Sequence, residues 1–237
     1  MLLFLYHKVG DYLQAFLHLF YPHICLDCGT DLLSRHTVLC ISCENNLPYT
    51  DFFQIENNIV EKVFWGRCKV MAAGAALFFT KDALVQLLIF ELKYNQNKKA
   101  GWFLGRIIGT AIQRLTPYNN IDFLIPIPIS RAKERQRGFN QSVVICEGIQ
   151  QILHPIKIAC LLKKQKSTRS QTYKGRLQRS EPIGHLFELT EAFPIKGANL
   201  LLVDDVITTG ATLESACQCL WKGQPRSVYI AAAAYTI

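Results

Sequence analysis

The feature that most constrains this chain is residues 200–212, LLLVDDVITTGAT, where two acids and a threonine–glycine turn follow an apolar run. A continuous apolar run is typical of a strand buried on both faces of a parallel sheet. Such a strand would bring Asp204 and Asp205 to its carboxyl end, and the turn opens directly into a helix expected over residues 211–221. Because ligands of these sheets bind at the carboxyl ends of the strands, we expect the functional site there.

The turn after the two acids has the composition of a phosphate-binding loop. Backbone N–H groups at a helix start, together with the hydroxyls of Thr208, Thr209 and Thr212, form a receptor for an anion. Gly210 lets the backbone approach that anion without a Cβ in the way. No Gly-Lys-Ser/Thr follows the turn, so the string is not a Walker loop.

The carboxylates of Asp204 and Asp205 would repel a phosphate, so they serve some other group. They suit a neighbouring diol, such as the 2′- and 3′-hydroxyls of a ribose, and they suit a hard divalent cation held directly or through water. The alternative is a strand end whose Asp residues cap the next helix. The order of residues in the whole string favours a site for a ribose phosphate.

The rest of the chain alternates between strand-like and helix-like segments, which predicts an α/β fold with a mostly parallel, doubly wound sheet. The expected strands cover residues 70–79, 122–128, 155–162, 199–203 and 227–235, and the expected helices cover 82–92, 98–115, 139–153 and 211–221. A length of 237 residues accommodates one full α/β domain and a small accessory module. We place these at residues 65–237 and 1–55.

Residues 200–212 resemble the phosphoribosyl-pyrophosphate motif of type I phosphoribosyltransferases: four apolar residues, two acids, then Thr-Thr-Gly-x-Thr. The resemblance implies that fold, with 5-phosphoribosyl-1-pyrophosphate (PRPP) and Mg2+ as ligands. Asp204 and Asp205 would hold the ribose hydroxyls. The 5′-phosphate would lie on the loop made by Ile207, Thr208, Thr209, Gly210, Ala211 and Thr212.

Further blocks make the chain similar to one branch, the ComF family, which joins an N-terminal four-cysteine module to a phosphoribosyltransferase domain. Residues 125–128, IPIP, and 137–141, RGFNQ, are similar to the family's Pro-x-Pro and Arg-Gly-Phe-Asn-Gln block. The Lys93-Tyr94 dipeptide resembles its Lys-Phe pair. The resemblance implies a pyrophosphate-binding side with charge-assisted hydrogen bonds. Its residues would be Pro128, Ser130, Arg131, Arg135 and Arg137.

A basic segment without apolar periodicity covers residues 163–179, and no acid occurs between Glu147 and Glu181. The resemblance implies a flexible catalytic loop that closes over the substrate and brings Arg169 and Arg179 to the departing pyrophosphate. The family's Arg-x-x-Asn ends in Pro182 here, so the loop departs from the family pattern. The alternative is a solvated basic face.

Two CxxC pairs, Cys25/Cys28 and Cys40/Cys43, are separated by 11 residues. Four thiolates in this pattern close tetrahedrally around zinc, and a structural zinc compensates for the small apolar core of such a segment. The pattern predicts a small zinc-ribbon-like module at the amino terminus. Disulfides are the alternative, but residues 1–21 contain no secretory signal pattern.

The amino-terminal residues 1–21 are apolar, yet His7, Lys8, Asp11 and His18 interrupt them. A spanning helix needs about 20 largely apolar residues. We therefore expect an amphipathic helix packed on the protein itself, with a membrane-surface role as the alternative. We expect no membrane span and a cytoplasmic chain.

Lysine and arginine outnumber acids by 26 to 18, a formal charge of +8, which favours polyanionic partners. Two functions remain open. One is an enzyme that transfers a phosphoribosyl group, with Asp204, Asp205, Arg169 and Arg179 as catalytic residues. The other is a ligand-sensing or single-stranded DNA-binding accessory protein, because the ComF resemblance implies natural competence and a helicase-like partner. The acceptor and the oligomeric state, a homodimer included, are open too.

Overall fold

The computed structural model describes residues 22–31, 37–80, 83–165, 186–190 and 194–237. The expected amino-terminal helix and residues 166–185 of the basic segment lie outside the described residues. The chain divides into two compact units, Met1–Leu47 and Pro48–Ile237. This boundary comes before the expected residue 55, because Tyr49 forms a bridge with Leu77 and the Thr50 N–H donates to the Ala76 carbonyl in the second unit.

The second unit is built on a five-stranded sheet with the order β1-β7-β6-β2-β3, and every pair in it is parallel. Its strands are β1 (Ala73–Phe79), β2 (Phe123–Pro126), β3 (Lys157–Ile158), β6 (Asn199–Ile207) and β7 (Ser227–Thr236). A separate antiparallel pair consists of β4 (Leu162–Lys164) and β5 (Phe187–Leu189). The central strands β6 and β7 are buried along most of their length, as their apolar sequences predict.

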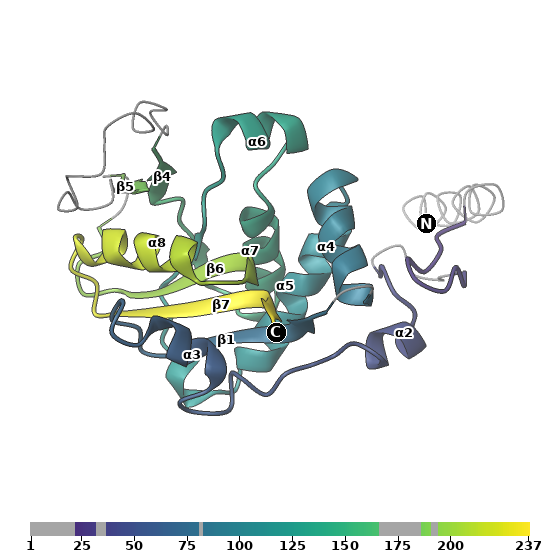
Figure 1. Cartoon of the computed structure of the whole chain (residues 1–237), viewed down its shortest axis with the longest axis horizontal. Coiled ribbons are helices and arrows are strands. Elements are labelled where there is room, and N and C mark those ends of the chain that lie inside the picture. The colour runs from purple at the N-terminus through teal and green to yellow at the C-terminus, as the bar shows by residue number, and fades with distance from the viewer. Residues whose placement is uncertain (1–21, 32–36, 81–82, 166–185, 191–193) are drawn as a thin grey trace, which may run out of the picture. The chain divides into compact units, whose positions relative to one another are not determined.

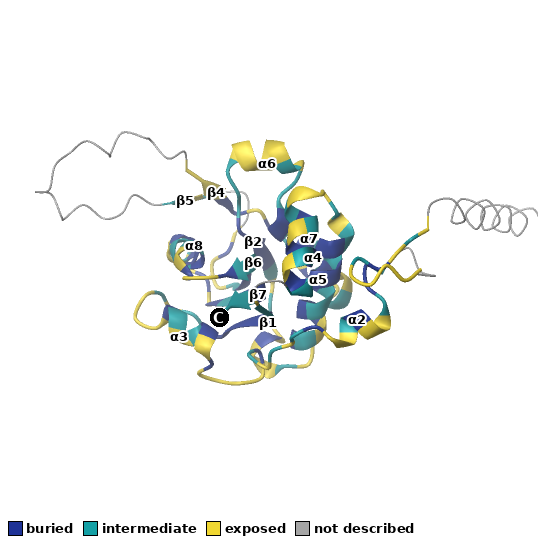
Figure 2. Cartoon of the chain, turned by 45° about the vertical axis from the view of Figure 1, so that its right-hand side comes forward, coloured by how far each residue is buried: buried dark blue, intermediate teal, exposed yellow. Residues whose placement is uncertain are grey.

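Helices cover both faces of this sheet (Figures 1 and 2). One face carries α4 (Leu84–Tyr94), α5 (Lys98–Ile112) and α7 (Gln141–Ile152), and the other carries α3 (Ile59–Phe64) and α8 (Ala211–Trp221). A 3-10 turn, η1 (Thr116–Tyr118), leads into β2. The predicted mostly parallel, doubly wound sheet is therefore confirmed.

Some elements differ from the sequence-based expectations in extent, and others were not expected. The strand expected over residues 155–162 is interrupted after β3, and β6 continues to Ile207 because β7 pairs with it that far. Neither α3 nor α6 (Arg131–Arg137) was expected, because each is shorter than two full turns and shows little periodicity. Side chains cap both helices: Asn58 accepts from the Val60 and Glu61 N–H groups, and Ser130 accepts from the Lys133 N–H.

Helices α5 and α7 approach one another at backbone distance, because glycine occupies both contact positions. A Cβ added at Gly105 would lie 2.1 Å from the Ile145 carbonyl oxygen, and one added at Gly148 would lie 2.3 Å from the Trp102 carbonyl oxygen. The Trp102 Nε1–H also donates to the Glu147 carboxylate at 2.7 Å. This contact fixes α7, whose amino-terminal end lies beside the candidate site described below.

We predict that Gly105→Ala destabilises the protein by about 1–3 kcal/mol, because the added methyl group overpacks a backbone contact that cannot relax through a side chain. Urea unfolding measures the loss. Thr110→Ala, at an exposed position of the same helix, is the matched control and should change the free energy of unfolding by less than about 0.5 kcal/mol. Equal stability of Gly105→Ala and wild type would contradict the tight crossing.

Candidate functional site

The two acids lie within the last half of β6 rather than after its end. Pairing between β6 and β2 ends at Val203, opposite Pro126, whereas pairing with β7 continues to Ile207, opposite Tyr235. The segment from Asp204 onward therefore has a strand on one side only. On its other side β2 has already ended, and the loop that follows β2 begins there. The acids therefore lie at the carboxyl ends of the sheet strands, as the sequence predicted.

The Asp204 carboxylate is held by groups on its own element and on α7. Its Oδ1 accepts from the Ser142 hydroxyl at 3.3 Å and from the Asp205 N–H at 2.9 Å. Burial, and next the neighbouring Asp205 carboxylate, raises the pKa of Asp204 from 3.8 to about 7. Near neutral pH this carboxyl group can therefore either give or take a proton.

The Asp205 carboxylate forms an ion pair with a lysine from the opposite side of the site. Lys93 Nζ, in the last turn of α4, lies 2.9 Å from Asp205 Oδ2. The sequence motifs do not predict Lys93 as a site residue, although the Lys93-Tyr94 dipeptide resembles the Lys-Phe pair of the ComF family. The sequence alone does not show that Lys93 pairs with Asp205, because α4 and β6 are more than 100 residues apart in the chain and meet only in the folded protein.

The loop at residues 207–212 has the backbone geometry of an anion receptor. Gly210 has a φ of 72° in the left-handed region and directly precedes α8. A Cβ there would lie 2.5 Å from Val63 Cγ1, so both the backbone angle and the close neighbour require glycine. Among the described residues, no side chain caps the first turn of α8, and Thr208 and Thr209 are exposed. The N–H groups of this turn can therefore receive a ligand.

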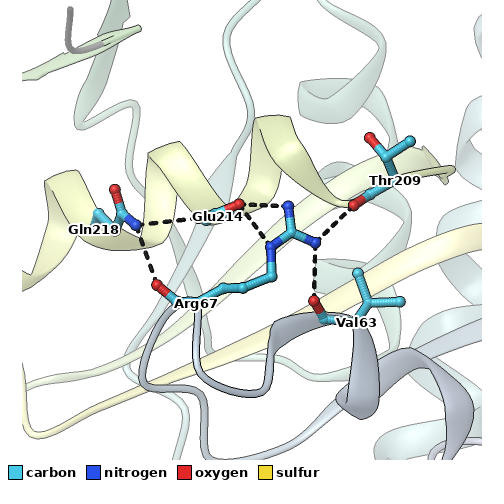
Figure 3. A network of polar contacts seen from close by, with 5 residues as sticks. All are labelled: Val63, Arg67, Thr209, Glu214 and Gln218. Atoms are coloured by element: carbon cyan, nitrogen blue, oxygen red, sulfur yellow. Dashed lines mark hydrogen bonds and ion pairs between the residues drawn. The ribbon is translucent and has the colours of Figure 1, made fainter. Parts of the chain in front are cut away.

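A polar network fixes this loop against the turn after α3 (Figure 3). The Arg67 guanidinium donates to the Thr209 carbonyl at 2.9 Å, to the Val63 carbonyl at 2.9 Å, and through Nε to the Glu214 carboxylate at 2.9 Å. The Gln218 Nε2 donates to the Arg67 carbonyl at 3.1 Å. Arg67 thus ties the loop and the first turn of α8 to one rigid position.

The expected pyrophosphate side begins where β2 ends. The Asn140 side chain donates to the Ile127 carbonyl at 2.9 Å and accepts from the Ser142 N–H at 3.1 Å. It therefore links the loop at Pro128 to the start of α7, next to the Asp204–Ser142 contact. Ser130 is occupied as the cap of α6. These contacts support a structural role for Asn140.

The three arginines of the expected pyrophosphate side lie on α6, which contains no buried residue (Figure 2). Arg131 and Arg135 are exposed, and the Arg137 guanidinium lies 5.7 Å from the Tyr94 ring centroid, one residue after Lys93. Arg137 therefore contacts the residue that follows Lys93, the partner of Asp205. Among the described residues, no contact joins Arg131 or Arg135 to Lys93 or to the two acids. Arg169 and Arg179 lie outside the described residues.

The four amino-terminal cysteines form a second candidate site, in the first unit. Their Sγ atoms all lie within 4.8 Å of one another, and the Sγ atoms of Cys28 and Cys40 are 3.6 Å apart. Tetrahedral Zn–S bonds of about 2.3 Å require sulfur–sulfur distances near 3.8 Å. The Cys40 N–H also donates to Cys25 Sγ at 3.3 Å, a contact that favours a thiolate. The donor set therefore fits zinc.

Helices long and apolar enough to cross a bilayer do not occur in the described part of the chain.

Comparisons with known proteins show which chains this one is similar to. The family model "Phosphoribosyl transferase domain" matches residues 140–236. DNA utilization protein YhgH of Escherichia coli O157:H7 is 26% identical over 62% of this chain and 65% of its own length. Competence protein ComFC of Bacillus subtilis is 37% identical over 44% of this chain and 41% of its own length. Competence protein F of Haemophilus influenzae is 23% identical over 86% of this chain and 93% of its own length. The chain thus spans less than two thirds of the length of YhgH and ComFC.

Among solved structures, purine phosphoribosyltransferase from Pyrococcus horikoshii Ot3 is similar over 57% of this chain and 87% of its own, with 15% identity and a TM-score of 0.38.

The raised pKa of Asp204 predicts a stability that depends on pH. Below pH 4 the carboxyl group is protonated in both states, whereas between about pH 4 and pH 7 only the unfolded state loses the proton, so rising pH destabilises the fold. Asp204→Asn cannot ionise. The difference in free energy of unfolding between Asp204→Asn and wild type should therefore shift in favour of the variant by about 1–4 kcal/mol as pH rises from about 5 to 8. Urea unfolding measures this difference.

The exposed Asp122 carboxylate, which accepts from the Asn199 N–H at the other edge of the sheet, supplies the control. Asp122→Asn should show no stability gain toward alkaline pH. A constant difference between Asp204→Asn and wild type over this range would contradict the buried, proton-holding carboxyl group.

Proposed function

We propose that this chain, which is a phosphoribosyltransferase-like protein of the ComF family with the type I phosphoribosyltransferase α/β fold, binds PRPP at the carboxyl edge of its sheet. The observation that carries the proposal is the arrangement of β6, Gly210 and α8, in which paired carboxylates adjoin a helix start that no described side chain caps. Each half suits a different part of one ligand.

The loop receives the 5′-phosphate. Backbone N–H groups at residues 208–212 and the hydroxyls of Thr208, Thr209 and Thr212 supply the donors, and the dipole of α8 favours the negative charge. Arg67 contributes through position, because it holds the Thr209 carbonyl and Glu214 and leaves the N–H side of the loop free.

The carboxylates receive the ribose. Two hydroxyls on adjacent ring carbons can donate to Asp204 and Asp205, whose oxygens are acceptors when ionised. Magnesium would be held beside them by carboxylate oxygens, directly or through water, and when bound it supplies positive charge to the pyrophosphate and ribose oxygens. The carboxylate oxygens of this pair are the hard donors that such an ion prefers.

The reaction that fits these roles is transfer of the 5-phosphoribosyl group to a nitrogen nucleophile, in which a C–N bond forms at the anomeric carbon and pyrophosphate leaves with the electrons of the broken C–O bond. Arg131, Arg135 and Arg137 on α6, and Arg169 and Arg179 beyond the described residues, are the cations proposed for that leaving group. Of the two acids, Asp204 is the better suited to take a proton from the acceptor, because its pKa lies near 7.

A second candidate is a binding protein in DNA uptake that keeps the ligand pocket without turnover. The names of the relatives, which refer to competence and DNA utilization, favour it. Single-stranded DNA or a helicase-like competence protein, as the family resemblance implies, would be its partner. The segment between Cys28 and Cys40 contains no Phe, Tyr or Trp for base stacking, which weakens the case for DNA binding by the zinc module itself. We place the protein in the cytoplasm, where thiolates stay available for zinc, and leave a homodimer open.

Isothermal titration with PRPP and Mg2+ tests the proposed site. The wild type should bind, and Asp204→Asn/Asp205→Asn should bind at least about tenfold more weakly, because it loses charge-assisted hydrogen bonds. Asp122→Asn removes a carboxylate at the opposite edge of the sheet and should keep wild-type affinity. Failure of the wild type to bind at millimolar PRPP would rule out the site for both functions.

Pyrophosphate release across a panel of nitrogen acceptors then separates the two functions. Release that depends on the acceptor and disappears in the Asp204/Asp205 double variant supports the transferase. Binding without release from any acceptor supports the binding protein.

Metal analysis of purified protein tests the cysteine site. We predict about one zinc per chain in wild type and its loss in Cys40→Ser, because three thiolates hold the ion far less tightly than four. The exposed Cys160 lies outside the cluster, so Cys160→Ser should retain zinc. Zinc retained in full by Cys40→Ser would contradict a four-cysteine site.

A further inference from the structure

A lysine ammonium group lies where a cation bound to the paired acids would lie. Lys93 Nζ is 2.9 Å from Asp205 Oδ2, and the two side chains are only 21% and 14% exposed. At this exposure water screens the attraction weakly, so the pair is stronger than a surface ion pair. The other acid is engaged as well, because Asp204 Oδ1 accepts from Ser142 and from the Asp205 N–H.

The turn that carries Lys93 is fixed on both sides. The Glu91 carboxylate accepts from the Asn95 side chain at 2.6 Å and from the Asn97 side chain at 3.2 Å. These two hydrogen bonds fix the residues that follow α4 against its last turn. Next to Lys93, the Tyr94 ring lies against the Arg137 guanidinium of α6. The Lys93 backbone is therefore held in place, and only its flexible four-carbon stem can redirect the charge.

From this geometry we infer that Lys93 is a positioning residue. Its ion pair with Asp205 keeps free divalent cations from binding the paired carboxylates, and it releases Asp205 when a phosphoribosyl ligand binds. The inference rests on the proposed function for the identity of that ligand. It goes beyond it by giving the ligand-free site a defined state, in which the protein's own cation occupies Asp205.

The physical reason is a balance of charge. Two neighbouring carboxylates without Lys93 would attract a hard divalent ion directly. With Lys93 in place, an incoming ion must displace one hydrogen-bonded cation and meets repulsion from it. A ligand with phosphate groups offers the ammonium group new anionic partners, so Lys93 can leave Asp205 without being left unpaired. Lysine suits this exchange because it is a compact point charge with three donors.

Binding of Mn2+ to the zinc-loaded full chain without any phosphoribosyl ligand, followed by the electron paramagnetic resonance signal of free Mn2+, tests the inference. Lys93→Met should bind Mn2+ at least about tenfold more tightly than wild type. Adding Asp205→Asn to Lys93→Met should abolish the gain. Lys98→Met removes a nearby lysine that lies over the Phe139 ring rather than on the acids, and it should behave as wild type.

Lys93→Gln provides a second variant that keeps a polar side chain, and circular dichroism checks that each variant is folded. Equal Mn2+ affinity in wild type and in both Lys93 variants would overturn the inference, as would an equal gain in Lys98→Met. The proposed function fails separately, if wild type does not bind PRPP, whatever the Lys93 variants do with Mn2+.

Discussion

The paired carboxylates of Asp204 and Asp205 are the constraint on which the candidate site depends. Adjacent negative charges in a mostly buried strand are costly, and each acid has its own compensation. Asp204 is hydrogen-bonded by Ser142 and retains a proton up to near-neutral pH, whereas Asp205 is paired with Lys93. These partners come from α7 and α4. Both helices must therefore lie beside the carboxyl-terminal half of β6 for the two acids to be stabilised.

The loop at residues 207–212 shows the complementary arrangement, because the stabilising contacts of Thr209 and Gly210 come from the side of α3. Arg67 binds the Thr209 carbonyl and Glu214, and Val63 packs against Gly210. All of these contacts come from the α3 side of the loop (Figure 3). No described side chain caps the N–H groups at the start of α8, so the anion site proposed there would be preorganised.

Much of the fold could be predicted from the sequence, because long periodic segments and buried apolar runs determine it. The helix at residues 211–221 and the strands at β6 and β7 are examples. Short elements such as α6 could not be predicted, because seven residues with Ala132 as their one apolar side chain carry no periodicity, although the Ser130 and Gly138 caps mark its ends. Lys93 could not be assigned to the site, because its pairing with Asp205 depends on how α4 packs. The roles expected for Arg169 and Arg179 remain predictions.

Backbone amide chemical shifts of the folded protein, followed as PRPP and Mg2+ are added, test the central claim most directly. If the carboxyl edge of the sheet holds a ribose phosphate, the largest shifts should fall on the N–H groups of residues 208–212, with a second group at Asp204 and Asp205. The opposite edge, at Asp122 and Asn199, should be unaffected. Shifts confined to other parts of the chain, or no shifts at saturating ligand, would contradict the claim.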